Sequence, residues 1–102
     1  MIRVVVMLAA KPGRRDELIA AFEDVAQTVR REAGCIEYAA FVDATGVGPF
    51  QAKVGPDRCI ILEKWESAEA LNAHVAQPHM AAYNKKTKDL IASLAIHAVT
   101  AV

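Results

Sequence analysis

The order of the hydrophobic patterns along the chain constrains the fold more than any other feature of the sequence. Four short segments rich in apolar and β-branched residues predict strands. Helical segments separate the first strand from the second and the third from the fourth. The expected strands are Ile2–Ala10, Cys35–Asp43, Arg58–Glu66 and Ser93–Val102. The resulting β-α-β-β-α-β order predicts an α+β, ferredoxin-like fold with a four-stranded antiparallel sheet and both helices on one face.

Local signals place the two helical segments. In the first, apolar residues recur at the spacing of a single helix face. They are Leu18, Phe22, Val25 and Val29. The second is expected to begin after Ser67, a residue type that caps helix N-termini, and to be interrupted at Pro78 before a last piece that runs to about Ile91.

The apolar alternation of the strands leaves neither face of the sheet polar. In the first strand Val4 and Val6 point to one face, whereas Val5 and Met7 point to the other. Two helices can cover only one of these faces. A second copy of the chain is the most economical cover for the other face, so we expect a homodimer.

Between the second and third strands lies a long segment, Ala44–Asp57, with three glycines and two prolines. We expect this loop to be the most mobile part of the chain. It could fold over the mouth of a pocket or reach a partner subunit.

Length and charge restrict the classes of function. The 102 residues correspond to one domain, 1–102, and 12 basic residues balance 12 acidic ones. Nucleic acids and anionic membranes need a basic surface, so neither is expected as a partner. No apolar run approaches the roughly 20 residues of a membrane span. With no signal peptide and no CxxC spacing, the chain is expected to be cytoplasmic with free cysteines.

Side chains able to bind a ligand or transfer a proton concentrate in the segment Glu63–Tyr83. Glu63 and Trp65 share one face of their strand, while His74 lies on the following helix. His79 follows the break at Pro78, and Tyr83 is one helical turn further on. We therefore expect Trp65, His74, His79 and Tyr83 to border one pocket between the sheet and the second helical segment.

Each of these residues has an alternative structural role. Trp65 could be a core or interface aromatic, and His74 a solvated helix residue. Glu63 could be an acid whose pKa is raised by burial, or it could pair with an arginine, which we favour. Tyr38 on the second strand could supply a pocket hydroxyl or be an ordinary strand aromatic. Two histidines without an evident third ligand argue against a metal site.

The sequence resembles the antibiotic biosynthesis monooxygenase (ABM) domain family, in particular its quinol monooxygenase type. The resemblance covers nearly the whole chain in order. It rests on Lys11–Gly13, Glu32–Tyr38, Glu63–Ser67, Ala70-Leu71, His74 and Pro78-His79. It implies a dimeric α+β barrel in which two ferredoxin-like sheets pack face to face. Trp65 matches a tryptophan of the family's oxygenases. Haem-degrading members use an asparagine on the first strand, which this chain lacks, so haem is not expected.

The resemblance implies a small cofactor-independent monooxygenase for an aromatic, quinol-like or polyketide-like substrate, with molecular oxygen as co-substrate and no metal. His79 or His74 would act as the general base, and Trp65 and Tyr83 would hold the ring, with Glu63 and Tyr38 also in contact with the substrate. One alternative is an isomerase of a small, perhaps phosphorylated, metabolite, which would need basic pocket residues. Lys53, Arg58 and Lys64 are the candidates for that role. Another is a ligand-binding dimer without catalysis.

Overall fold

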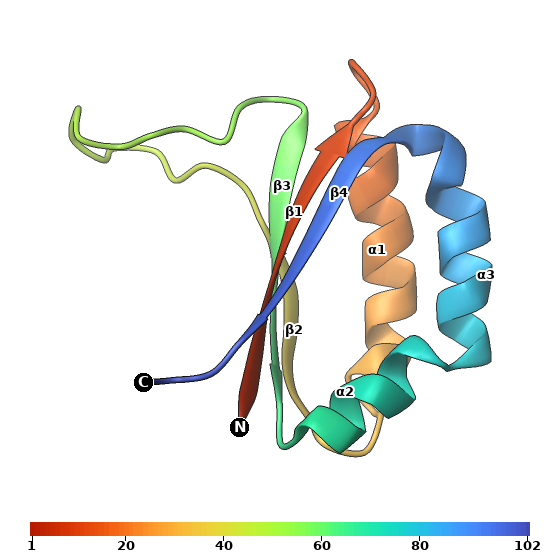
Figure 1. Cartoon of the computed structure of the whole chain (residues 1–102). Coiled ribbons are helices and arrows are strands. Elements are labelled where there is room, and N and C mark those ends of the chain that lie inside the picture. Colours follow the sequence, from red (N-terminus) through yellow and green to blue (C-terminus); the bar gives the residue numbers. More distant parts are fainter.

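A four-stranded antiparallel sheet, with all the helices on one side of it, forms the framework of the chain (Figure 1). A computed structural model describes all 102 residues. The strands lie in the order β2-β3-β1-β4. In chain order the elements are β1 (Ile2–Ala10), α1 (Arg15–Val29), β2 (Cys35–Phe41), β3 (Arg58–Trp65), α2 (Ala68–Val75), α3 (Pro78–Thr87), the 3-10 turn η1 (Lys88–Leu90) and β4 (Ile91–Val99). The predicted ferredoxin-like fold is confirmed.

The second helical segment begins and breaks where the sequence predicts. The Ser67 hydroxyl accepts a hydrogen bond from the backbone N–H of Ala70 at 3.1 Å and so caps α2. Pro78 is the first residue of α3, a position where its missing N–H costs nothing. The break turns the chain, so that α2 closes one end of the helix layer while α3 runs beside α1 (Figure 1).

Several boundaries differ from expectation. The last helix ends at Thr87 rather than near Ile91, and β4 begins at Ile91 rather than Ser93. Ile91 belongs to the strand because it pairs with Ala10, across an irregularity in the β1–β4 register. At the other ends, β2 stops at Phe41, β3 at Trp65 and β4 at Val99.

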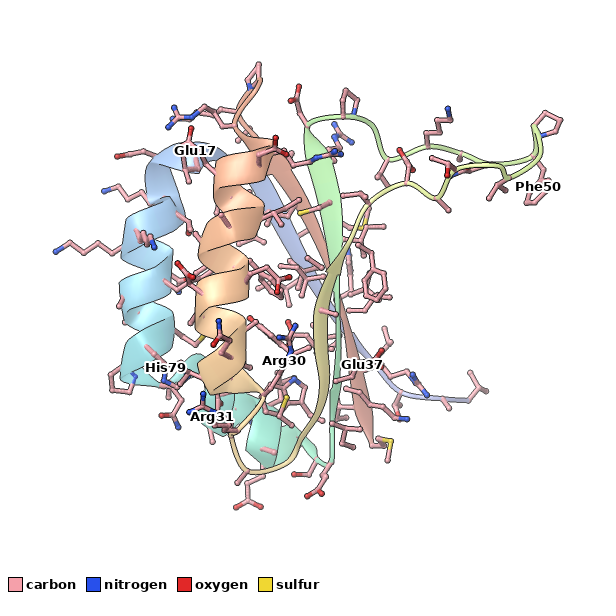
Figure 2. The ribbon with its side chains drawn as sticks, turned by 180° about the vertical axis from the view of Figure 1, so that it is seen from behind. Glu17, Arg30, Arg31, Glu37, Phe50 and His79 are labelled. Atoms are coloured by element: carbon pink, nitrogen blue, oxygen red, sulfur yellow. The ribbon has the colours of Figure 1, made fainter.

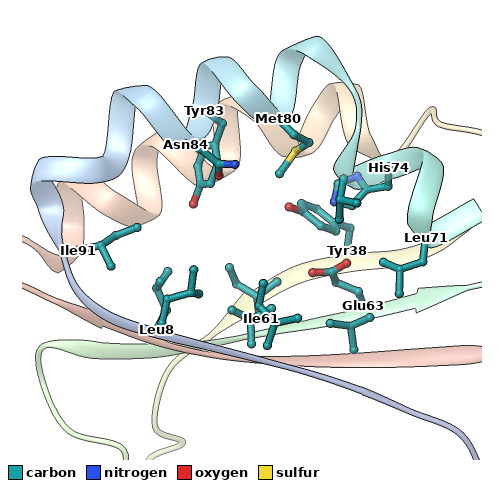
Figure 3. A pocket seen from close by; sticks show the side chains of 15 residues that line it. Leu8, Tyr38, Ile61, Glu63, Leu71, His74, Met80, Tyr83, Asn84 and Ile91 are labelled. Atoms are coloured by element: carbon teal, nitrogen blue, oxygen red, sulfur yellow. The ribbon is translucent and has the colours of Figure 1, made fainter. Parts of the chain in front are cut away.

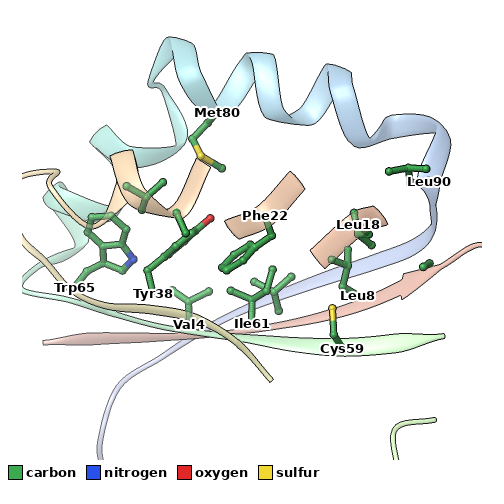
Figure 4. Close-up of a cluster of buried hydrophobic side chains, with 14 residues drawn as sticks. Val4, Leu8, Leu18, Phe22, Tyr38, Cys59, Ile61, Trp65, Met80 and Leu90 are labelled. Atoms are coloured by element: carbon green, nitrogen blue, oxygen red, sulfur yellow. The ribbon is translucent and has the colours of Figure 1, made fainter. Parts of the chain in front are cut away.

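The core lies between the sheet and α1. Alternate residues of β1 and β3 point toward the helices, as the pleat of a strand requires. Their apolar side chains pack against Leu18 and Phe22 of α1 (Figure 4). The principal sheet residues are Val4, Val6, Leu8, Cys59, Ile61 and Trp65. Glu63 and His74 are buried at the α2 end of the same layer, among otherwise apolar neighbours.

The sheet face opposite the helices carries a second apolar surface. Met7 pairs with Ile60, and Val5 pairs with Leu62. These residues alternate with the buried ones of β1 and β3, so they point away from the helices, to the side that no helix covers. Figure 1 shows that all the helices lie on the other side of the sheet. Phe41 of β2 pairs with Ile60 and extends this surface toward the edge of the sheet. The central part of the uncovered face is therefore apolar, as predicted, whereas Arg3, Glu37 and Lys64 make one end of it charged. None of the helices combines the length and the apolar character needed to cross a membrane.

The segment between β2 and β3 projects away from the sheet on the side opposite the helices (Figures 1 and 2). Its base is tied together because the Asp43 carboxylate accepts the backbone N–H groups of Gly55 and Val54 at 3.0 and 2.9 Å. These hydrogen bonds hold the pKa of Asp43 below its usual range. Phe50 at the tip is 86% exposed. The loop therefore does not cover the space between the sheet and α3; its mobility and its contact with a partner stay predictions.

Candidate functional site

A cavity of about 140 Å³ lies between the helix-covered face of the sheet and the helices α2 and α3 (Figure 3). Of its fifteen lining residues, twelve are hydrophobic. The apolar walls come from the sheet, from α2 and from α3, together with the start of β4. They include Val4, Val6, Leu8, Ile61, Leu71, Val75, Met80, Ile91, Leu94 and Ile96. The cavity is thus an apolar space with only a few polar groups at defined positions.

Five lining residues carry polar atoms: Tyr38, Glu63, His74, Tyr83 and Asn84. In Figure 3 the Glu63 carboxylate and the Tyr38 hydroxyl point into the space from the sheet side, and the Asn84 amide points into it from α3. Burial raises the pKa of Tyr83 to about 12 and raises that of Tyr38 further. Both phenols are therefore neutral hydroxyls at neutral pH and can donate hydrogen bonds to an occupant.

Glu63 is held by Trp65, its neighbour on the same face of β3. The indole Nε1–H donates to Glu63 Oε1 at 2.9 Å. Burial raises the pKa of Glu63, although this hydrogen bond and the nearby His74 act in the opposite direction. The preferred expectation of an arginine partner is not met within the chain, because the side-chain partner of Glu63 is the Trp65 indole and no arginine forms an ion pair with it. The other reading of this residue, an acid perturbed by burial, describes it better.

His74 is enclosed by aromatic rings and anchored by a carboxylate. The ring centroid of Trp65 lies 4.7 Å away, and the Tyr38 ring meets His74 edge-on at 5.5 Å. His74 Nδ1 lies 3.0 and 3.2 Å from the two carboxylate oxygens of Glu32. The side chain of His74 is only 4% exposed. The imidazole is therefore fixed in both position and orientation.

Glu32 also binds the second histidine of this region. His79 Nε2 lies 2.8 Å from Glu32 Oε2, and the Glu32 side chain is 10% exposed. Glu32 follows α1 and lies 42 residues from His74 along the chain. No local pattern could pair these residues, which explains why sequence reasoning missed Glu32. Asn84 was also missed, because a polar residue on a helix usually faces solvent.

The structure brings together only some of the residues expected to border one pocket. His74 and Tyr83 line the cavity, as do Glu63 and Tyr38. Trp65 lies behind His74 and is completely buried, and His79 faces a shallow groove between α1 and α3. The expectation that Trp65 and His79 line the same cavity is therefore wrong. On the first turn of α3, Met80 takes the inward position and directs His79 toward α1.

The polar atoms of the cavity remain available to a ligand. Arg15 Nε is the one buried side-chain nitrogen or oxygen that lacks a hydrogen-bond partner. His74 Nε2 and the Tyr38 hydroxyl make no hydrogen bond within the chain, yet neither is among the fully buried atoms without a partner, so both keep accessible surface. Because both residues line the cavity, these atoms can reach a ligand bound there. No group of three or more histidine, cysteine or acidic side chains is arranged to hold a metal ion. What the site offers is an imidazole nitrogen, two phenols, an amide and a carboxyl group around an apolar space.

Comparison with known proteins places the chain in a family. The family model described as antibiotic biosynthesis monooxygenase matches residues 1–86. The chain belongs to this family. It is 36% identical over 90 residues to the protein named "Probable quinol monooxygenase YgiN" of Escherichia coli, with 86% of each sequence covered. The resemblance predicted from the sequence motifs is thereby confirmed.

Solved structures agree with this assignment. A crystal structure of a Deinococcus radiodurans protein assigned to the same family superposes with a TM-score of 0.82 at 25% identity, covering 100% of this chain and 93% of that one. A Shewanella oneidensis protein reaches a TM-score of 0.80 at 27% identity, with 96% and 87% covered. A Nitrosomonas europaea protein reaches 0.84 at 16% identity, with 100% and 99% covered, which shows the fold alone.

The buried carboxyl group of Glu63 should make stability depend on pH. Because burial raises its pKa in the folded state, its contribution to stability is complete below its unfolded pKa of about 4.3 and is lost as pH rises through the folded value. Glu63→Gln, which keeps an acceptor for Trp65, should therefore unfold at a higher temperature than the wild type at pH 8 but not at pH 4. Each kcal/mol of difference corresponds to about 4–8 °C.

Thermal melts followed by circular dichroism at both pH values measure this effect. Glu66→Gln is the matched control because its side chain is exposed. A Glu63→Gln variant that gained no stability at pH 8 relative to pH 4 would show that the carboxyl group is not destabilised by its surroundings.

Proposed function

We propose that the chain is a monooxygenase that uses molecular oxygen to hydroxylate a phenolic, quinol-like ring bound in the cavity. Membership of the antibiotic biosynthesis monooxygenase family and the name of the Escherichia coli relative support this class of reaction. The observation that carries the proposal is the placement of His74, whose unbonded Nε2 has access to an apolar cavity beside two hydroxyl donors. His74 is the base in this proposal, in preference to His79.

The size of the cavity supports a substrate with one aromatic ring inside it. A dry apolar cavity of about 150 Å³ in another protein holds benzene, whereas pockets for drug-sized ligands measure about 300–1,000 Å³. The cavity here measures about 140 Å³, close to the volume of the cavity that holds benzene. Leu94 and Ile96 line it but are 51% and 62% exposed, so the space opens at β4. Substituents on the bound ring would extend out of the cavity through this apolar opening.

The chemistry follows from removing a proton from the ring hydroxyl. His74 Nε2 accepts that proton, and the negative charge of the phenolate spreads onto a ring carbon. This carbon transfers electrons to oxygen and forms a C–O bond, after which the O–O bond breaks and water leaves. Overall, a quinol and O₂ give a hydroxyquinone and water. The quinol itself supplies both electrons needed to reduce the second oxygen atom, so the proposed reaction uses no flavin, haem or metal.

Other groups around the cavity would bind and orient the substrate. The hydroxyls of Tyr38 and Tyr83 stay protonated because burial raises their pKa values, so they can donate to the developing negative charge. The Asn84 amide and the Glu63 carboxyl group face the same space and can bind the second ring hydroxyl. Trp65 supports the site from behind His74 rather than forming a wall for the substrate.

The alternative activity on a phosphorylated metabolite finds no support in the cavity. Phosphate recognition needs cationic side chains, and no lysine or arginine lines this space. Lys53 lies in the projecting loop, Arg58 is exposed at the start of β3, and Lys64 points to the opposite face of the sheet from Glu63.

Replacing His74 tests the proposed function. Wild-type protein should consume oxygen in the presence of a hydroquinone. His74→Ala should lower kcat by about 10²–10⁴-fold because the substrate hydroxyl loses its base. His74→Asn places its amide nitrogen near the position of Nδ1 and so keeps an N–H donor for Glu32, which makes it a second variant if the alanine variant unfolds. Asn72→Ala is the matched control, since this residue is exposed on the same helix as His74 and lies outside the cavity.

Oxygen uptake and formation of the hydroxyquinone absorbance band are the measurements, with melting curves to verify folding. Wild-type protein that is inactive on every hydroquinone and phenol tested would refute the proposed function. Full turnover by folded His74→Asn would refute the assignment of the base.

We also propose that two copies of the chain associate through the uncovered face of the sheet. This face presents Met7, Ile60, Leu62 and Phe41, and an apolar surface of this kind is usually covered in a soluble protein. Phe50 on the projecting loop lies on the same side and would extend the contact (Figure 2).

Light scattering should give a mass of about twice 11.0 kDa for the wild type. Leu62→Glu places a charge at the centre of the proposed contact and should shift the mass to that of one chain. Ala20→Glu on the exposed side of α1 should leave the dimer intact. A wild-type mass of 11.0 kDa at micromolar concentration would contradict the proposal.

A further inference from the structure

A single carboxylate, Glu32, joins histidines from two different helices. Its oxygens lie 3.0 and 3.2 Å from Nδ1 of His74 on α2 and 2.8 Å from Nε2 of His79 on α3. Figure 2 shows His79 near the end of α1, close to Arg30 and Arg31, the two residues that directly precede Glu32 in the chain. We propose that Glu32 is a positioning residue that fixes the tautomer of His74, and that His79 holds Glu32 in place. This inference rests on the proposed function of His74.

The chemistry of imidazole determines the direction of the effect. A neutral histidine carries its proton on one ring nitrogen and has a free lone pair on the other. An ionised carboxylate can only accept hydrogen bonds, so the nitrogen that faces Glu32 must carry the proton. Nδ1 of His74 is that nitrogen, which leaves Nε2 as the acceptor. Because Nε2 makes no hydrogen bond in the chain, its lone pair is free for a substrate hydroxyl.

The surroundings of Glu32 explain why a second histidine is needed. The Glu32 side chain is only 10% exposed, and a largely buried carboxylate is costly unless hydrogen bonds compensate for its lost hydration. His79 supplies one such bond from outside the cavity, and its own side chain is 26% exposed in the groove between α1 and α3. His79 thus acts on the reaction through Glu32 and His74, without touching the substrate.

A purely structural role makes different predictions. If Glu32 only linked the end of α1 to α2 and α3, its removal would lower stability and would leave the tautomer of His74 unchanged. Tautomers are read from the ring ¹⁵N chemical shifts in long-range ¹H–¹⁵N correlation spectra of labelled protein. The chain has only three histidines, so each ring can be assigned by substitution. This readout does not depend on activity.

The wild-type spectrum should show neutral His74 protonated at Nδ1 with a bare Nε2. In Glu32→Gln the amide can donate as well as accept, so the Nε2-protonated form of His74 should become populated. Exposed His97 should not change and serves as the internal control. A wild-type His74 protonated at Nε2, or an identical tautomer in folded Glu32→Gln, would overturn the inference.

Enzyme kinetics provide a second test of the inference about Glu32. Folded Glu32→Gln should lose about 10–100-fold in kcat with KM little changed, because the substrate still fits the cavity while part of the His74 population carries its proton on Nε2 and cannot accept another there. Glu32→Asp, which keeps the charge, should recover part of the loss. His79→Gln, whose amide can still donate to Glu32, should be more active than His79→Ala. A loss of kcat that only followed the folded fraction in each variant would contradict the inference. An inactive wild type with the expected tautomer would refute the proposed function alone.

Discussion

The pleat of β3 is the constraint on which the site depends. Because alternate residues of a strand share a face, Glu63 and Trp65 point toward the helices together with Cys59 and Ile61. This places a carboxyl group and an indole in a layer that is otherwise apolar. The indole satisfies one carboxyl oxygen and also supports the His74 ring from behind. The helices then enclose the remaining space instead of filling it, which leaves the cavity.

Burying ionisable groups in this apolar layer lowers the stability of the fold, and a functional role would explain why the chain carries them there. Burial raises the pKa values of Glu63, Tyr38 and Tyr83, which means that the fold disfavours their charged forms. A sequence selected for stability alone would favour apolar residues here. Perturbed titratable groups that converge on a cavity are typical of a site that binds and transforms a ligand. The family to which the chain belongs is consistent with that interpretation.

Local patterns in the sequence were sufficient to predict most of the fold. Alternation identified the strands and their two apolar faces, Ser67 marked the start of α2, and Pro78 marked the break before α3. The boundaries of β4 could not be derived, since they depend on pairing between Ile91 and Ala10 across an irregular register. Within the site, residues close in sequence were placed in the right region. Glu32 was missed because only the folded chain brings it to His74, and which way His79 faces depends on how α3 packs against α1.

Incorporation of oxygen from ¹⁸O₂ tests the central claim most directly. Under ¹⁸O₂, a hydroquinone turned over by the protein should give a hydroxyquinone that contains one ¹⁸O atom, with the other ¹⁸O in water. Mass spectrometry of a product extracted before exchange with solvent measures this label. A quinone without label, together with labelled hydrogen peroxide, would mean that the cavity supports only oxidation of the quinol, and the monooxygenase account would be wrong.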